Sequence, residues 1–184
     1  MDSSRLTRVV VVGTSCTGKT TLARTLSSQL DVPHIELDAL HWGPNWTPRP
    51  LDEFQSRVET VIASPAWVIE GNYSTVRAAI WQRATTLVWL NYSFMRVYSQ
   101  AVSRTIRRVL TQEELYSGNR ESIRQIVDPD WIPWWVIRTF WLRRREYPAL
   151  LQEPGAAHLQ FLEFTGPKQT EHFLSACTTA RLQD

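Results

Sequence analysis

Short apolar runs along this chain alternate with longer segments in which apolar residues recur every three or four positions. The runs are typical of buried parallel strands, and we expect strands at 8–12, 32–38, 67–70, 85–91 and 158–164. The longer segments predict helices at 20–30, 51–63, 74–83, 94–110, 128–145 and 168–182. Such regular alternation favours an α/β fold, in which helices pack around a parallel sheet.

The segment between the first strand and the first helix carries the most specific chemical signal. Residues 13–20 read GTSCTGKT and fit the pattern of a phosphate-binding P-loop. The backbone N–H groups of such a loop form an anion-binding nest at the positive end of the helix dipole. The residues expected to contact the nucleotide are Gly13, Thr14, Ser15, Cys16, Thr17, Gly18, Lys19, Thr20 and Thr21.

Two side chains of this loop have separate expected roles in binding ATP and Mg²⁺. Lys19 can bridge the β- and γ-phosphates, and the Thr20 hydroxyl can ligate Mg²⁺. The alternative is a glycine turn before a helix that carries a surface lysine. The preceding strand, the spacing, the lysine and the threonine together favour a nucleoside triphosphate site.

Two acidic residues end predicted strands, where open parallel sheets bind their ligands. Asp38 could accept a hydrogen bond from a substrate hydroxyl or act as a base, or it could simply cap the next segment. If its strand neighbours the first one, Glu70 could orient the water shell of the metal or act as a base; the alternative is a plain surface glutamate. Asn91 ends the fourth strand, where a second acidic metal ligand is usual, and this shifts the acidic role to Glu70, Asp38 or both.

Three arginines, Arg104, Arg107 and Arg108, lie at positions i, i+3 and i+4 of a predicted helix. Facing the P-loop, they would clamp a transferring phosphoryl group, and Arg120 could close the clamp from the far side. The alternative is a solvated helix face, partly neutralised by Glu113 and Glu114.

Two segments are rich in tryptophan. Residues 41–50 read HWGPNWTPRP and are expected to form a rigid loop that could wall an acceptor pocket, with Arg49 either holding an anion or solvated. Residues 128–145 combine tryptophans with arginines. A helix of this composition could lie on a membrane surface, stack on bases, or pack its tryptophans on the body of the domain.

Composition places the chain among globular proteins. Its 184 residues suit one domain, 43% of them are apolar, and the net charge of +2 does not imply a general affinity for nucleic acid. The two cysteines are too few for a disulfide framework and fit a cytoplasmic location. The apolar run near the N-terminus is too short for a signal peptide or a membrane span.

Several motifs together resemble the adenylate-kinase-like P-loop kinases, and most of all the bacterial proteins known as DNA topology modulation or FlaR-related proteins. The matching segments are GTSCTGKTTLAR, HIELDALHWGPNW, WVIEGNY, LVWLNYS and SGNRES. The resemblance implies a three-layer fold with a five-stranded parallel sheet of order 2-3-1-4-5, and a helical lid over about 104–146 of a single domain 1–184. It also implies an acidic role for Glu70 and a basic cluster of Arg104, Arg107 and Arg108 at the mouth of the lid.

The leading hypothesis is therefore a nucleoside monophosphate kinase-like enzyme that transfers the γ-phosphoryl group of Mg-ATP to a small acceptor. The acceptor could be a nucleotide, a nucleoside or another small metabolite, but the segment lacks the usual AMP-site pattern and the tryptophan loop stands in its place. The alternative hypothesis is an ATP-dependent module that binds nucleic acid or protein and has no kinase activity.

Overall fold

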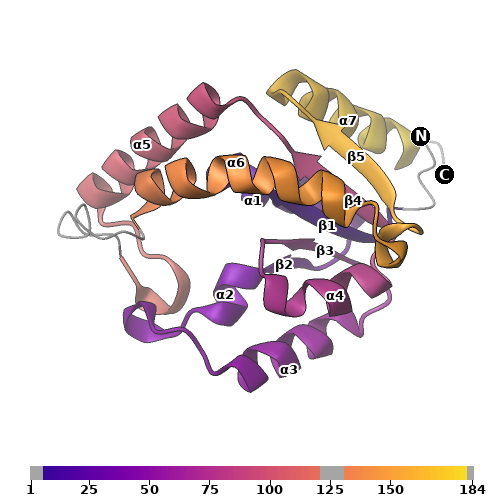
Figure 1. Cartoon of the computed structure of the whole chain (residues 1–184), viewed down its shortest axis with the longest axis horizontal. Helices are drawn as coiled ribbons and strands as arrows, with labels where there is room; N and C mark the ends of the chain where they lie inside the picture. Colours follow the sequence, from indigo (N-terminus) through magenta and orange to yellow (C-terminus); the bar gives the residue numbers. More distant parts are fainter. Residues whose placement is uncertain (1–5, 121–130, 182–184) are drawn as a thin grey trace.

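The computed structural model describes residues 6–120 and 131–181, and its centre is a five-stranded sheet whose neighbouring strands are all parallel. The strands are β1 (Arg8–Gly13), β2 (His34–Glu36), β3 (Trp67–Glu70), β4 (Thr86–Leu90) and β5 (Gln160–Phe164). Their order across the sheet is β2-β3-β1-β4-β5, which confirms the expected fold class (Figure 1).

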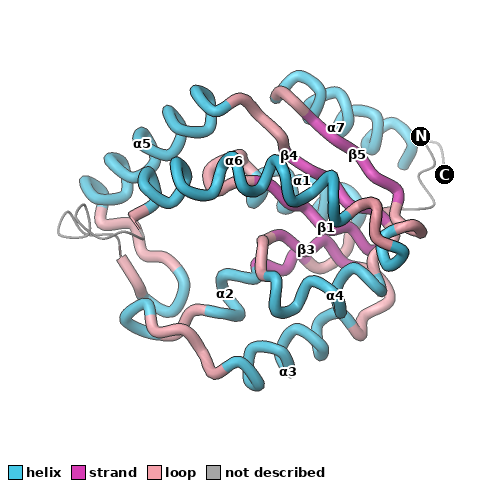
Figure 2. Tube along the Cα trace, viewed as in Figure 1, coloured by secondary structure: helices cyan, strands magenta, loops and turns pink. Residues whose placement is uncertain are grey.

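Helices cover both faces of the sheet and give the molecule three layers, as the colouring by secondary structure makes plain (Figure 2). The α-helices are α1 (Lys19–Leu30), α2 (Leu37–His41), α3 (Leu51–Ile62), α4 (Ser74–Arg83), α5 (Phe94–Thr111), α6 (Ile132–Leu150) and α7 (Pro167–Arg181). Short 3₁₀ helices lie at Pro44–Trp46 (η2), Tyr116–Gly118 (η3) and Pro154–Ala156 (η5).

The central strand β1 divides the core in two, because successive side chains of a strand point to opposite faces of the sheet. Val9 and Val11 pack in one buried cluster with side chains of α1, α5, α6 and α7. Val10 and Val12 pack in a second cluster with side chains of α3 and α4. Each valine that leaves water contributes about 1.5 kcal/mol or more, so this run holds β1, and the loop that follows it, firmly in place.

The second strand is shorter than expected, and this changes the position of Asp38. Only His34 to Glu36 pair with β3, and the chain then turns into α2. Asp38 lies in the first turn of this short helix, so it neither ends the strand nor occupies the N-cap position, which belongs to Glu36. It remains close to the carboxyl edge of the sheet, because the turn follows the last paired residue directly.

Helices α5 and α6 pack against each other through aromatic side chains. The ring of Phe94 lies 5.2 Å from that of Phe140 and 6.3 Å from that of Trp141, measured between centroids. Phe140 is buried, whereas Trp134 and Trp141 are 50% and 57% exposed. These two tryptophans of the 128–145 segment therefore leave about half of their surface open to solvent, although Trp141 stacks on Phe94. Of that segment, residues 128–130 lie outside the described residues.

No helix within 6–120 or 131–181 is long and apolar enough to cross a membrane.

Replacement of Gly71 by alanine should destabilise the fold by about 2 kcal/mol or more. Gly71 has a φ of +140°, and an added Cβ would lie 2.8 Å from the Cβ of the buried Leu37. Gly155→Ala is the matched control, since a Cβ there would meet no atom within 4 Å. Urea denaturation of both variants tests the prediction, and equal loss of stability in the two would contradict the close packing of Gly71 against α2.

Candidate functional site

The P-loop adopts a conformation that depends on glycine at its first position. Gly13 has a φ of +149°, and a Cβ added there would lie 2.7 Å from the carbonyl oxygen of Leu90 in β4. Cys16 and Gly18 are left-handed, with φ values of +67° and +91°. Turns of this kind aim successive N–H groups at one point, and that arrangement binds anions. A Cβ at Gly18 would face open space.

Lys19 and Thr20 begin α1 directly beneath the loop. Lys19 Nζ donates a hydrogen bond to the carbonyl oxygen of Thr14 at 3.2 Å. The hydroxyl of Thr20 donates to Oε1 of Glu70 at 2.6 Å. Because β3 pairs with β1, Glu70 reaches the first turn of the P-loop helix, as expected if the two strands were neighbours. The plain surface position is excluded, because Glu70 is only 4% exposed.

Burial dominates the electrostatics of Glu70. Loss of solvent raises the pKa of its carboxyl group, while the charge of Lys19 and the hydrogen bond from Thr20 act in the opposite direction. The negative charges of Asp38 and Glu36 add to the rise. Glu70 thus lies among cationic and anionic groups of the same site.

Two tyrosine hydroxyls hold the carboxylates beyond the P-loop. Tyr73 donates to Oδ1 of Asp38 at 2.6 Å, and Tyr116 donates to Oε2 of Glu36 at 2.6 Å. Burial, reinforced by these carboxylates, raises the pKa of both phenols, so both stay protonated donors. Glu36, Tyr73 and Tyr116 were not expected as site residues. Tyr73 follows Glu70 in the EGNY segment, and Tyr116 directly precedes the SGNRES segment, so both lie in or beside motifs of the resemblance.

The tryptophan loop is tied to the segment that follows α5. Ser117 Oγ donates to the carbonyl oxygen of Trp42 at 2.9 Å, and the side-chain amide of the buried Asn119 donates to that of Gly43 at 2.9 Å. The backbone N–H of Trp46 donates to Oδ1 of Asn119, also at 2.9 Å. These bonds join segments more than 70 residues apart. The expected loop is therefore present, and its residues Trp42 and Trp46 form part of the wall of a cleft.

One cleft of about 1250 Å³ collects most of the expected site residues. It is lined by Ser15, Cys16, Gly18, Lys19, Thr20, Thr21, Asp38, Glu70, Arg104, Arg107 and Arg108, together with Glu36, Trp42, Trp46 and Tyr116. Gly13, Thr14 and Thr17 also belong to the P-loop, but they are buried and shape the loop from its inner side. The three arginines of α5 thus share a face that lines the cleft; Arg104 and Arg108 are half-buried there, whereas Arg107 is exposed.

Individual arginines differ in their partners. Arg107 pairs with Glu113 at 3.2 Å, and the Nε atom of Arg104 is buried with no hydrogen-bond partner among the described residues. Arg120 does not line the cleft: it is exposed and lies 3.6 Å from Glu114, across the short bridge that these two residues form. Arg49 likewise faces an acidic partner, Glu53, at 3.2 Å.

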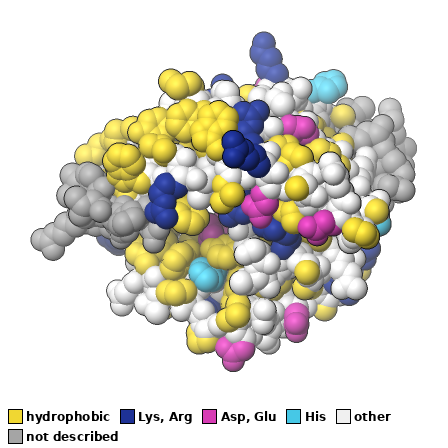
Figure 3. Space-filling model, viewed as in Figure 1, with side chains coloured by type: hydrophobic (Ala, Val, Ile, Leu, Met, Phe, Trp, Pro, Cys, Tyr) yellow, Lys and Arg dark blue, Asp and Glu magenta, His cyan; other side chains and the backbone are white. Residues whose placement is uncertain are grey.

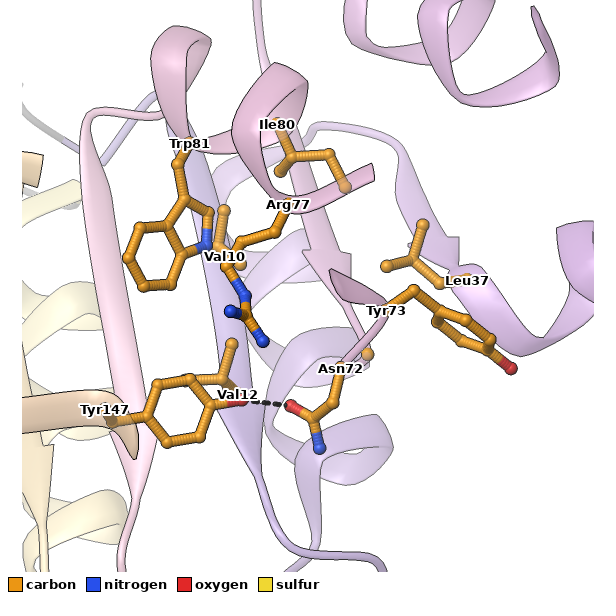
Figure 4. Close-up of a pocket in the computed structure, with 10 residues that line it drawn as sticks. Val10, Val12, Leu37, Asn72, Tyr73, Arg77, Ile80, Trp81 and Tyr147 are labelled. Atoms are coloured by element: carbon orange, nitrogen blue, oxygen red, sulfur yellow. Dashed lines mark hydrogen bonds between the residues drawn. The ribbon is translucent and has the colours of Figure 1, made fainter. Parts of the chain in front are cut away.

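Asn72 connects the P-loop to the far end of α6. Its side-chain amide donates to the carbonyl oxygen of Gly13, and its Oδ1 accepts a hydrogen bond from the Tyr147 hydroxyl at 2.6 Å (Figure 4). Arg143 also donates to the backbone carbonyl of Asn72, at 3.4 Å. The cavity in this region, drawn in Figure 4, measures about 10 Å³, so it has no room for a substrate. This cluster therefore supports the P-loop and does not form a second site.

Asn91, which takes the place of an acidic strand end, turns away from the P-loop. Its side-chain amide donates to Oε1 of Glu163 at 2.7 Å, and its backbone N–H donates to the carbonyl oxygen of Phe164. Both partners belong to β5, at the edge of the sheet.

The residues present fit a nucleoside triphosphate with its metal ion. The left-handed loop, the open space at Gly18 and the lysine behind the loop suit a chain of phosphates. The Thr20 hydroxyl donates its hydrogen bond to Glu70. The lone pairs of the hydroxyl oxygen therefore stay available to a cation. Within 6–120 and 131–181, no cluster of three His, Cys, Asp or Glu side chains could hold a metal by itself. Mg²⁺ commonly takes oxygen ligands from substrate phosphates, so such a cluster is not required.

Comparison with protein-family models gives no match, and neither does comparison with the curated proteins. Solved structures do match. Shikimate kinase from Bacteroides thetaiotaomicron aligns with a TM-score of 0.53 and 17% identity, over 95% of this chain and 97% of that chain. A gluconokinase from Sinorhizobium meliloti aligns with a TM-score of 0.51 and 16% identity, over 97% of this chain and 94% of that chain. The chain therefore has the P-loop fold of these kinases over nearly its whole length.

Replacement of Glu70 by glutamine should raise the melting temperature at neutral pH. Because burial raises the pKa of Glu70, the folded state holds the proton more tightly than the unfolded state, and stability falls as the pH rises above the usual glutamate pKa. The amide avoids that loss, so the difference in melting temperature should be largest at neutral pH and vanish below the usual glutamate pKa. Each 1 kcal/mol corresponds to about 2–4 °C. Calorimetry across this pH range tests the sign, and a variant less stable at neutral pH would contradict it.

Proposed function

We propose that this protein is a kinase that transfers the γ-phosphoryl group of Mg-ATP to a small-molecule acceptor. One observation carries the proposal: the P-loop, Asp38 and the three arginines of α5 line the same cleft. A phosphate-binding loop, a proton acceptor and a cationic clamp are the parts that phosphoryl transfer requires. The fold shared with two small-molecule kinases supports the same conclusion.

Asp38 is proposed as the base that activates the acceptor. Tyr73 donates a hydrogen bond to its Oδ1, whereas Oδ2 has no partner among the described residues. Because the raised pKa of Tyr73 keeps the phenol protonated, the tyrosine fixes the carboxylate in one orientation. The remaining oxygen can take the proton of an acceptor hydroxyl as that hydroxyl attacks the phosphorus.

Cationic side chains are proposed to stabilise the charge that spreads over the phosphoryl oxygens. Lys19 would exchange its bond to the Thr14 carbonyl for a bond to phosphate, and Arg104 would gain a partner for a buried, unpaired Nε atom. Groups that are already in place when the charge develops need little reorganisation, and such groups commonly supply the largest part of the rate enhancement.

The residues proposed to hold the metal are Thr20, directly, and Glu70, through the water shell of the ion. Mg²⁺ supplies positive charge that neutralises the phosphate oxygens during transfer. Glu70 acts on this site by accepting the hydrogen bond of Thr20, which orients the hydroxyl oxygen.

Residues 104–146 are proposed as a helical lid on a single domain that spans 1–184. The contacts of Tyr116, Ser117 and Asn119 with β2 and the tryptophan loop support a closed position of this lid. Residues 121–130 of the range lie outside the described residues. An adenylate-kinase-like enzyme of the cytoplasm, related to the DNA topology modulation proteins, fits the motifs and the two cysteines, neither of which is in a disulfide.

A second candidate function is an ATP-dependent module that binds nucleic acid or protein. One observation favours it: hydrophobic side chains gather on the exposed face over α5 and α6 (Figure 3). On α6 the exposed positions include Trp134, Ile137, Trp141 and Leu142, beside Arg138 and Arg145. Exposed tryptophans can stack on bases, and arginines can contact phosphates.

Asp38→Asn is expected to keep ATP binding at the wild-type level and to lower acceptor-dependent ADP release by about 10²-fold or more. The amide keeps the shape of the side chain but cannot take a proton at neutral pH. Lys19→Ala serves as the contrast, because it should weaken the binding of Mg-ATP itself. Calorimetric titration measures binding, and a deproteinised metabolite extract supplies the acceptor. If Asp38→Asn turned over at the wild-type rate, Asp38 would take no part in the chemistry.

Arg104→Ala should lower turnover by roughly 10³-fold, by analogy with an arginine finger, with a much smaller effect on ATP affinity. Arg96→Ala is the matched control, because Arg96 is an exposed arginine of the same helix that does not line the cleft. Steady-state kinetics of the two variants measure the difference.

If the protein is instead a binding module, the wild type and a tryptophan variant should behave differently from a kinase. Wild type would then release no acceptor-dependent ADP, and Trp134→Ala would weaken the binding of a single-stranded oligonucleotide, measured by fluorescence anisotropy. That pair of results would overturn the kinase proposal.

A further inference from the structure

The part of the cleft beside β2 and α2 has its own chemical character. We call it the acceptor end and define it by Glu36, Asp38, Trp42, Trp46 and Tyr116, all of which line the cleft. Glu36 pairs in the sheet with Glu70, and Asp38 follows it by two residues, so the carboxylates come from one edge of the sheet. The charges of Glu36, Asp38 and Glu70 all contribute to the raised pKa of Tyr116, as expected if they surround its hydroxyl.

Among the described residues, Glu36 has a single cationic partner, Arg24. Its neighbours are the neutral hydroxyl of Tyr116 at 2.6 Å, Arg24 at 3.4 Å and His34 at 3.8 Å. The guanidinium of Arg24 is 70% exposed, so solvent screens that ion pair. Burial lowers the pKa of His34, and the imidazole is therefore neutral at neutral pH.

Asp38 has no cationic partner among the described residues. Tyr73 donates a neutral hydrogen bond to it, and burial lowers the pKa of the nearby His41, so that imidazole carries no charge at neutral pH. Each tyrosine hydroxyl donates its single hydrogen bond to one of these carboxylates, so neither hydroxyl can donate a hydrogen bond to a ligand. The acceptor end thus presents oxygen atoms that accept hydrogen bonds, with negative charge behind them.

Two arginines near this end, Arg49 and Arg120, are paired with carboxylates other than Glu36 and Asp38. Arg49 pairs with Glu53, and Arg120 pairs with Glu114, which itself lines the cleft. Glu113 of the cleft wall pairs with Arg107 at 3.2 Å and Glu36 pairs with Arg24 at 3.4 Å, whereas Asp38 has no ion pair among the described residues. A carboxylate or phosphate on the acceptor would therefore meet the like charges of Glu36 and Asp38 here, and the guanidinium beside them, that of Arg24, is already paired with Glu36.

Resting on the kinase function proposed above, we propose that the phosphoryl acceptor is a hydroxylated small molecule with no acidic group, and that acceptors with an ammonium group, such as amino sugars, are preferred. An ammonium group would donate to Glu36 while a hydroxyl donates to Asp38. Trp42 and Trp46, with ring centroids 5.8 Å apart, add indole faces that attract a cation and pack against a sugar ring.

The test uses the full-length protein with Mg-ATP labelled in the γ-phosphoryl group. A deproteinised cell extract is separated by ion exchange into anionic, neutral and cationic small molecules, and each fraction is offered as acceptor. We expect label to pass to compounds of the cationic fraction first and of the neutral fraction second. Transfer to the anionic fraction alone would overturn the proposed acceptor class but leave the kinase function standing. Transfer to no fraction would contradict the kinase function itself.

A variant then links the preference to Glu36. Glu36→Gln keeps a carbonyl oxygen for the Tyr116 hydroxyl but removes the charge, so it should raise KM for the cationic acceptor about tenfold, with little change in kcat. Glu59→Gln is the matched control, because Glu59 is an exposed glutamate of α3 outside the cleft. An unchanged KM in Glu36→Gln, with wild-type melting temperature, would show that Glu36 does not select the charge of the acceptor.

Discussion

The parallel pairing of β1 with β3 is the constraint on which the whole site depends. It places Val11 opposite Glu70, so the loop that leaves β1 and the carboxylate that ends β3 emerge at the same edge of the sheet. The hydrogen bond from Thr20 to Glu70 then fastens the first turn of α1 to the neighbouring strand. Asn72, two residues further on, binds Gly13 and accepts a bond from Tyr147, so the same pairing also fixes the end of α6. A change in register by one residue would undo all of these contacts together.

The features that could be predicted from the sequence are those with local signals. Four consecutive valines, a glycine loop and a helix that begins with Lys19 follow from spacing within some twenty residues. The shared face of Arg104, Arg107 and Arg108 could be predicted for the same reason, since helical periodicity sets it. The strand order 2-3-1-4-5 came instead from the resemblance, because alternation of strands and helices does not determine which strands are neighbours.

What could not be predicted depends on contacts between distant segments. Tyr116 reaches Glu36 across 80 residues, and nothing in the local pattern of either residue points to the other. Arg120 was expected to close the clamp, but the short bridge between its own segment and Glu114 turns it towards that glutamate and out of the cleft. Asp38 was expected at the end of a strand; its true place in α2 follows from the early end of the pairing between β2 and β3, which only the folded sheet determines.

The cleft holds side chains of both charges, and this bears on how a kinase of this kind would work. Lys19 and the three arginines of α5 bring positive charge to its lining, while Glu36 and Asp38 bring negative charge. A triphosphate is attracted to the cationic side chains and repelled by the carboxylates, and this difference favours one orientation over the other. The tyrosines that bind Asp38 and Glu36 are protonated, neutral donors, so their hydrogen bonds do not cancel the negative charge of these carboxylates. In the proposed kinase, the carboxylates that would repel phosphate from the acceptor end would therefore also orient the nucleotide, and one arrangement of charge would serve both substrates.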